Sequence, residues 1–149
     1  MLNRDWIAAH IPHRDRMCLL DTVSAWSSEN IRCTASSHRL ADHPLRAEGR
    51  LGAACGIEYA AQAMAIHGAL LAAGDDRPRQ GYLTSVRSVD LLVDRLDDLA
   101  ADLDVRAERL SGDDNNVLYQ FSVHAGERLL LAGRAAVILD AAAVKASST

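Results

Sequence analysis

The stretch LGAACGIEYAAQAMAIHGALLAAG, residues 51–74, decides how this chain folds. Small and apolar residues occupy nearly every side of the helix that it predicts, and a helix that is apolar all round is buried rather than laid on a surface. Its one acid is Glu58. Because burial strips a carboxylate of hydration and raises its pKa, we expect Glu58 to be matched to a cation or kept for chemistry. Gln62 shares its face one turn later, and Tyr59 is the adjacent polar-tipped residue.

Around this helix the hydrophobic pattern predicts mostly strands. The expected order is a short helix, two strands, the long helix and four strands, over residues 4–11, 17–26, 30–37, 51–74, 82–93, 102–110, 117–125 and 129–139. In the strand at 82–93 the alternation puts Leu83, Val89, Leu91 and Val93 on one side. Strands gathered around one segregated helix predict an α+β fold, in which an antiparallel sheet wraps the helix. With neither repeat nor linker, we expect a single domain over residues 1–149.

Composition narrows the class of protein. About half of the residues are apolar and the formal net charge is −4, so nothing in the overall charge favours nucleic acid. The three cysteines are widely spaced and suggest neither a zinc site nor a disulfide framework, so we expect a cytoplasmic protein without a metal. The N-terminus lacks the apolar core of a signal peptide. The alanines, Glu58 and His67 make the long helix a core helix rather than a membrane span.

Three segments carry a resemblance to a known family: IPHRDRMCLLDTV (11–23), DHPLRAEGRLGAACGIEYAAQAMA (42–65) and VDRLDDLAADLDVRAERL (93–110). In order and spacing they resemble the hot-dog fold, in which a curved antiparallel sheet wraps a central helix. More narrowly, the chain looks like the β-hydroxyacyl-carrier-protein dehydratases, and within them the small ApeP-like proteins of aryl-polyene gene clusters. The resemblance implies a 3-hydroxyacyl-carrier-protein dehydratase that uses no cofactor beyond the phosphopantetheine arm carrying its substrate.

The resemblance also implies roles for single residues. His43 would be the base and Glu58 the acid, with the two residues of one site supplied by different protomers of a homodimer or heterodimer. Backbone N–H groups of Gly52 and Ala53 at the helix N-terminus would bind the thioester oxygen. The predicted substrate-binding residues also include Gln62 and Tyr59. For these two the alternatives are an orienting role for the first and core packing for the second.

Arginines gather in sequence around the proposed mouth of the site, at Arg46, Arg50, Arg77 and Arg79. The resemblance makes an acidic acyl carrier protein the expected partner for such a patch, while a solvated rim is the alternative. Apolar residues that could hold an acyl chain, or belong to the core, are Leu51, Ile57, Met64 and Leu83. Among the remaining histidines we expect His67 in the core or an interface, and surface or turn positions for His10, His13, His38 and His124.

Two other functions stay open at this point. A hot-dog thioesterase would use Glu58 to activate water or to attack the thioester, although a base at His43 favours dehydration. A catalytically weak accessory subunit would instead stabilise an active hot-dog partner. The loop Asp42-His43-Pro44-Leu45-Arg46 differs from the Gly-His-Phe-Pro-Gly loop of orthodox dehydratases, and this difference keeps the accessory role open.

Overall fold

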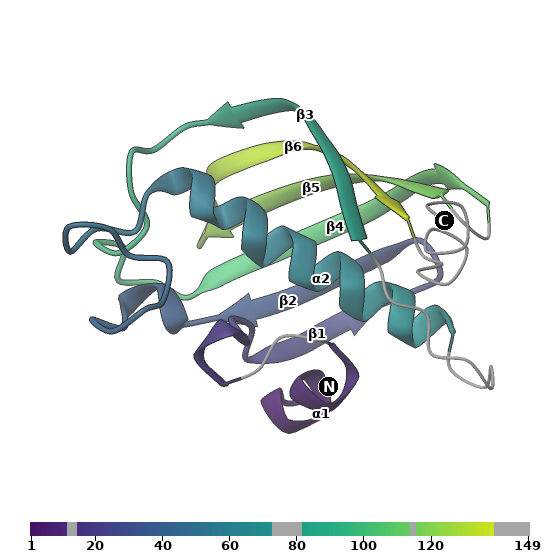
Figure 1. Cartoon of the computed structure of the whole chain (residues 1–149), viewed down its shortest axis with the longest axis horizontal. Helices are drawn as coiled ribbons and strands as arrows, with labels where there is room; N and C mark the ends of the chain where they lie inside the picture. The colour runs from purple at the N-terminus through teal and green to yellow at the C-terminus, as the bar shows by residue number, and fades with distance from the viewer. Residues whose placement is uncertain (12–14, 73–81, 114–115, 139–149) are drawn as a thin grey trace, which may run out of the picture.

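A six-stranded antiparallel sheet wraps one long helix in the computed structural model of the chain, which describes residues 1–11, 15–72, 82–113 and 116–138 (Figure 1). The strands are β1 (Thr22–Trp26), β2 (Asn30–Ala35), β3 (Tyr82–Leu91), β4 (Leu103–Gly112), β5 (Asn116–Ala125) and β6 (Arg128–Ile138). Their order across the sheet is β1-β2-β4-β5-β6-β3, and every neighbouring pair is antiparallel. The predicted α+β class and hot-dog arrangement are therefore confirmed.

The central helix α2 (Gly56–Leu71) begins with a 3-10 turn at Ala53–Cys55, inside the predicted range of 51–74. It lies across one face of the sheet and buries small residues, including Ala60 and Ala63. Gly56 marks a close approach, because a Cβ there would lie 2.6 Å from the Leu131 side chain on β6. Within the described ranges, no helix is long and apolar enough to cross a membrane.

The first helix, α1 (Arg4–His10), matches its predicted range and is capped by Asn3, whose side chain accepts from the Trp6 N–H. The strand predicted at 17–26 is shorter. It begins only at Thr22, and Asp15–Met17 forms a 3-10 turn. The backbone of Met17 and Leu19, outside the sheet, is instead hydrogen-bonded to the Gln62 side chain on α2.

The side-chain alternation predicted for 82–93 holds for Val89 and Val93, which pack against the core, but is wrong for Leu83 and Leu91. Leu83 and Leu91 are 41% and 48% exposed, while Val86 and Val89 pack against the core. Two irregularities in the pairing of β3 with β6, between Leu83 and Ser85 and between Arg87 and Asp90, change which residues face inward. Leu83 therefore does not line an interior space in this chain, whereas Leu51 and Met64 are core residues.

His67 is the core histidine that the sequence predicts. It is fully buried on α2, with Nδ1 2.7 Å from the Tyr119 hydroxyl on β5 and Nε2 2.7 Å from the Ser27 carbonyl. Since a carbonyl only accepts, Nε2 carries the hydrogen and Nδ1 accepts from Tyr119. Burial lowers the pKa of His67, in keeping with a neutral ring that ties the helix to the sheet.

Candidate functional site

A cluster of buried polar side chains, which includes Ser37, His43 and Tyr59, lies near the start of α2. Figure 1 shows the beginning of this helix beside the loop that leads into it from β2. The segment between β2 and α2 supplies most of it. A 3-10 turn at Ser37–Arg39 follows β2 directly, and backbone hydrogen bonds from His43 to Leu40 and from Arg46 to His43 then fold the chain back onto the helix. His43 is thereby brought against Tyr59, one residue after Glu58 on α2.

His43 stands in a chain of hydrogen bonds that runs in one direction. The Leu45 N–H donates to His43 Nδ1 (3.0 Å), and His43 Nε2 lies 3.0 Å from the Tyr59 hydroxyl. That hydroxyl is 2.6 Å from Ser37 Oγ, which donates to the Leu19 carbonyl (2.8 Å). Because an N–H occupies Nδ1, a neutral ring must carry its hydrogen on Nε2 and donate to Tyr59, and Tyr59 then donates to Ser37.

The electrostatics of the cluster agree with a neutral ring. Burial lowers the pKa of His43, and the charges of Arg46 and then His38 lower it further. Burial likewise raises the pKa of Tyr59 to about 12. Each ring nitrogen of His43 thus has a hydrogen-bond partner. A proton added to Nδ1 would point at the Leu45 N–H, which is itself a donor.

Glu58 is half-buried in this chain, not fully buried as its apolar surroundings predict. It lies in the first turn of α2, next to Tyr59. Since neighbouring helix residues point about 100° apart at 3.6 residues per turn, Glu58 does not share the inward face of Tyr59. The structure thus places the two predicted catalytic residues at the same end of the fold but on different sides of the helix.

Gln62 is wholly buried, and its amide is occupied by the backbone. Its Oε1 accepts from the Leu19 N–H (2.9 Å) and its Nε2 donates to the Met17 carbonyl (2.6 Å). This geometry favours a structural role for Gln62 over the predicted contact with substrate. Tyr59, which is also fully buried, is likewise held within the protein by His43 and Ser37.

The predicted binding of the thioester by two backbone N–H groups needs correction for Ala53. The Ala53 N–H already donates to the Asp94 carbonyl (3.1 Å), because residues 51–53 pair with the turn that contains Arg95. Gly52, in contrast, is exposed. The helix N-terminus is therefore tied to the 94–97 turn.

The arginine patch also differs from its prediction. Arg46 is only 15% exposed, and its guanidinium donates to the carbonyls of Gly49 (2.9 Å) and His38 (3.4 Å). It lies 3.8 Å from Asp97, so it belongs to the interior of the site. Arg50 is exposed as expected. Arg77 and Arg79, together with His13, lie outside the described residues.

Asp97 was not singled out in the sequence, although its segment carries part of the resemblance. Its side chain is 5% exposed, is ion-paired with Arg95 and accepts from the Leu51 N–H (2.9 Å). The hydrogen bond from Arg95 holds the pKa of this carboxyl well below its usual range. A buried anion thus joins the 94–97 turn, the start of the helix segment and Arg46.

His38 was predicted at a surface or turn position, and it lies in the 3-10 turn at Ser37–Arg39 but not at the surface. The ring is fully buried, with Nε2 3.0 Å from the Leu99 carbonyl. Its position in the turn after β2 gives no hydrophobic periodicity to interpret, and the loop between β3 and β4 supplies the Leu99 carbonyl beside it. His38 and His43 are close enough for the charge of one to lower the pKa of the other.

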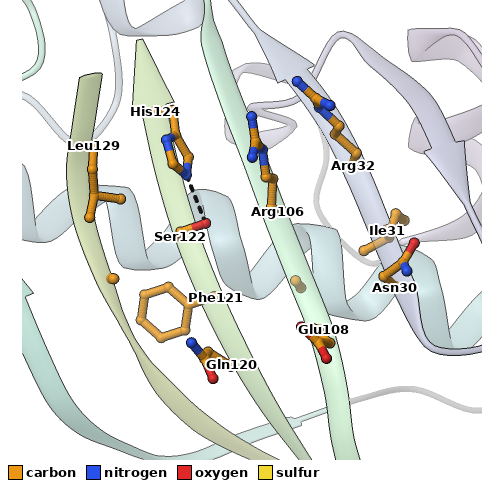
Figure 2. Close-up of a pocket in the computed structure, with 12 residues that line it drawn as sticks. Asn30, Ile31, Arg32, Arg106, Glu108, Gln120, Phe121, Ser122, His124 and Leu129 are labelled. Carbon is orange, nitrogen blue, oxygen red and sulfur yellow. Dashed lines mark hydrogen bonds between the residues drawn. The ribbon is translucent and has the colours of Figure 1, made fainter. Parts of the chain in front are cut away.

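A separate depression of about 470 Å³ lies on the outer face of the sheet, opposite α2 (Figure 2). Arg32 and Arg106 face it, and both bind Asp104 through bonds of 2.7 Å. Asp104 thus pairs with both cations, and Glu108 also lines the depression. None of the residues of the His43 cluster lines this depression.

In the described part of the chain, no group of three or more histidine, cysteine, aspartate or glutamate side chains could hold a metal ion. The titratable side chains at this end of the fold include His38, His43, Tyr59 and Asp97, with the half-buried Glu58 next to Tyr59 on α2. Such groups can exchange protons with a substrate held between them.

Comparisons with known proteins agree with this fold. Residues 6–146 match the ApeP-like family, described as ApeP dehydratase. Among solved structures, the dehydratase heterocomplex ApeI:P from Xenorhabdus doucetiae has a TM-score of 0.83 at 20% identity, covering 100% of this chain and 99% of that one. A thioesterase from Haemophilus influenzae has a TM-score of 0.58 at 16% identity, covering 78% and 76%. A hypothetical thioesterase with coenzyme A from Streptococcus pneumoniae has a TM-score of 0.58 at 12% identity, covering 78% and 83%. No match was found among curated proteins.

Proposed function

The chain belongs to the ApeP-like dehydratase family, and on that premise we propose that it removes water from a 3-hydroxyacyl thioester carried by an acyl carrier protein in aryl-polyene synthesis. The observation that carries the proposal is the histidine cluster at the N-terminal end of the helix that bears Glu58. Supporting it are the burial of His43 and its direct contact with Tyr59, the residue next to Glu58. These features put candidate proton acceptors and a donor at one end of the fold.

The proposed reaction begins with loss of the proton on C2, which the thioester carbonyl acidifies. A neutral histidine suits this step because its pKa lies near the pH at which such enzymes work. The electron pair of the broken C2–H bond forms the new double bond, and the hydroxyl on C3 leaves with a proton from Glu58. The products are an enoyl thioester and one water. Glu58 suits the acid role if a partner subunit completes its burial, since loss of solvent favours the protonated carboxyl.

The family resemblance gives the role of base to His43. In the isolated chain His43 has no spare lone pair, because Nδ1 accepts from Leu45 and Nε2 donates to Tyr59. For His43 to take the C2 proton, the Leu45 amide has to move away from Nδ1. We therefore propose that docking of the thioester or of a partner subunit shifts the 43–46 turn.

The partner in this proposal is a second hot-dog subunit, in addition to the carrier protein. The Xenorhabdus doucetiae structure is a heterocomplex, ApeI:P, and this chain is similar to it over its whole length. The sheet ends at β3, whose outer edge pairs with no other strand in the described part of the chain, and β3 carries the exposed Leu83 and Leu91. Such an edge favours pairing with a strand of another subunit.

A second candidate function is an accessory subunit that stabilises an active hot-dog partner. One observation favours it: both nitrogens of His43 are hydrogen-bonded within the protein. In that case the histidine would stiffen the 43–46 turn, and the chemistry would reside in the partner. This candidate and the dehydratase differ in whether side chains of this chain are needed for turnover.

The test compares Glu58→Gln with Glu127→Gln, which makes the same change on the exposed turn between β5 and β6. Both are assayed on a 3-hydroxyacyl carrier protein, with the chain alone and with a co-expressed hot-dog partner. Loss of a general acid typically lowers the rate by about 10²–10⁴-fold, so we expect that loss for Glu58→Gln and none for Glu127→Gln. Wild-type turnover of the folded Glu58→Gln variant would remove Glu58 from the mechanism and favour the accessory role.

A further inference from the structure

Arg46 carries a positive charge into the interior of the fold, close to His43. Its side chain is 15% exposed, whereas Arg50, four residues later, is exposed. Nη1 of Arg46 donates to the Gly49 carbonyl (2.9 Å) and Nη2 to the His38 carbonyl (3.4 Å). The guanidinium therefore joins the backbone of the turn after β2 to the backbone of the 47–50 turn.

The charge of Arg46 is only partly balanced. The carboxylate of Asp97 lies 3.8 Å from Arg46 Nη1, which is beyond hydrogen-bond distance. Its two oxygens instead accept from Arg95, through Nε (3.0 Å) and Nη2, so one carboxylate serves two arginines. Arg46 Nε is buried and has no hydrogen-bond partner among the described residues. A buried charge that is incompletely paired is costly, so its presence beside the site calls for an explanation.

The backbone of Arg46 closes the turn that carries His43. The Arg46 N–H donates to the His43 carbonyl (3.1 Å), and the Leu45 N–H donates to His43 Nδ1 (3.0 Å). One residue thus ends the turn with its backbone and anchors it with its side chain. When the Leu45 amide moves away from Nδ1, as the proposed function requires, Arg46 is the fixed end of the moving segment.

The charge of Arg46 also acts on the ring of His43. The titratable and charged groups that face this ring are Asp42 and Arg46 in its own segment, His38 in the turn after β2 and Tyr59 on α2. After burial, the charge of Arg46 is the strongest influence that lowers the pKa of His43, and Asp42 acts in the opposite direction. A permanent cation near a histidine favours the neutral ring, which is the form that accepts a proton.

We propose that Arg46 is a positioning residue for His43, a role that rests on the proposed dehydration. Its buried guanidinium anchors the end of the 43–46 turn and sets a permanent positive charge close to the ring. The anchor fixes where the ring points when the Leu45 amide moves, and the charge favours the return of the ring to its neutral form after each turnover. Arg46 acts through His43 and not on the substrate itself.

The test separates the charge from the anchor. Arg46→Met removes both, whereas Arg46→Lys keeps the charge but replaces the planar fork with a single ammonium group. Arg50→Met makes the first change at the exposed arginine of the same segment and is the matched control. Urea denaturation shows whether each variant is folded. If Arg46→Met does not fold, Arg46→Gln takes its place, because glutamine is neutral and keeps two N–H donors.

The effect of the charge is measured without any substrate, by NMR titration of the His43 ring. This ring should titrate at a higher pH in Arg46→Met than in the wild type, because removal of the cation favours the imidazolium. Arg46→Lys and Arg50→Met should titrate like the wild type. A merely structural role would not separate methionine from lysine in this way. The same titration of His43 in the folded neutral variant and in the wild type would overturn the proposal.

The anchor is tested by dehydration of a 3-hydroxyacyl carrier protein with the partner subunit present. Misplacement of a catalytic group can cost about 10²-fold in rate, so we expect kcat to fall by roughly 10- to 10²-fold in Arg46→Met and less in Arg46→Lys. KM should change little in both. A rise in KM for the carrier protein with kcat unchanged would contradict the positioning role and return Arg46 to the predicted carrier-protein patch.

Failure of the proposed function is recognised separately, as absence of dehydration by the wild type with its partner. The titration of His43 does not depend on turnover. A shift in Arg46→Met but not in Arg46→Lys would then still support the influence of Arg46 on the ring, and equal titration in all four proteins would contradict it.

Discussion

Replacing Gln62 with leucine should lower the folding stability of this protein by about 2–4 kcal/mol, because the side chain is the hydrogen-bond partner of two buried backbone groups. Gln62 is fully buried on α2 and binds the N–H of Leu19 and the carbonyl of Met17. Leucine has a similar size and an equal or better helix propensity, so the substitution removes the hydrogen bonds with little change in packing.

The size of this stability loss follows from the two backbone groups that lose their partner, the Leu19 N–H and the Met17 carbonyl. A buried donor or acceptor that loses its partner costs about 1–3 kcal/mol, and here one of each is left. Entry of water beside Met17 would reduce the loss, which is why the expected value lies in the lower part of the summed range. For a domain of this size, the change corresponds to a fall in Tm of about 5–15 °C.

Urea denaturation followed by circular dichroism measures the change, with Gln120→Leu as the control. Gln120 lies exposed on the outer face of β5, so the same substitution there should change stability by no more than about 0.5 kcal/mol. If Gln62→Leu were as stable as the wild type but raised the KM for the thioester, Gln62 would be a substrate-binding residue and our structural interpretation would be wrong.

Three further predictions concern other buried groups. Burial lowers the pKa of His67 below 6.5, so the unfolded chain takes up its proton first. Stability should therefore be full above about pH 6.5 and fall by up to about 1.4 kcal/mol per pH unit below it. Urea titrations at pH 7.5 and 5.5 should show a smaller fall in His67→Gln, and an equal fall would contradict the assignment. Burial also raises the pKa of Cys33 to about 12, so a thiol reagent at pH 8 should modify only the half-buried Cys55 in the native protein, and all three cysteines only in denaturant. Rapid native labelling of three thiols would refute this. Finally, Tyr59→Phe breaks the link between His43 and Ser37 and should cost about 1–3 kcal/mol in the same urea assay. No loss would mean that this chain of bonds contributes nothing to stability.

Much of the fold could be predicted because it depends on local patterns. The apolar run at 51–74 predicted the central helix. Alternation of apolar and polar residues predicted the strands seen at Leu103–Gly112 and Asn116–Ala125. The inward face of β3 could not be predicted, since its irregular pairing with β6 is decided by a neighbour distant in sequence. The start of β1 was missed for a similar reason, since the backbone of Met17 and Leu19 is hydrogen-bonded to Gln62, which is distant in sequence.

The site was predicted less completely than the fold. Resemblance directed attention to His43 and Glu58, and the structure places both near the start of α2. Beyond Leu45, the hydrogen-bond chain through His43 joins Tyr59, Ser37 and Leu19, which come from three separate segments, so no spacing in the sequence reveals it. His38 and Asp97 had no signal of their own, because burial in a loop depends on tertiary contacts and follows no periodic pattern.

The most direct test of the dehydratase assignment is the mass of a 3-hydroxyacyl carrier protein after incubation with this chain, alone and together with a co-expressed hot-dog partner. We predict loss of one water from the carrier-bound acyl group, abolished by Glu58→Gln in the same preparation. Release of the free acid would instead identify a thioesterase. An unchanged rate when this chain carries Glu58→Gln and the partner is intact would contradict the account and make this protein an accessory subunit.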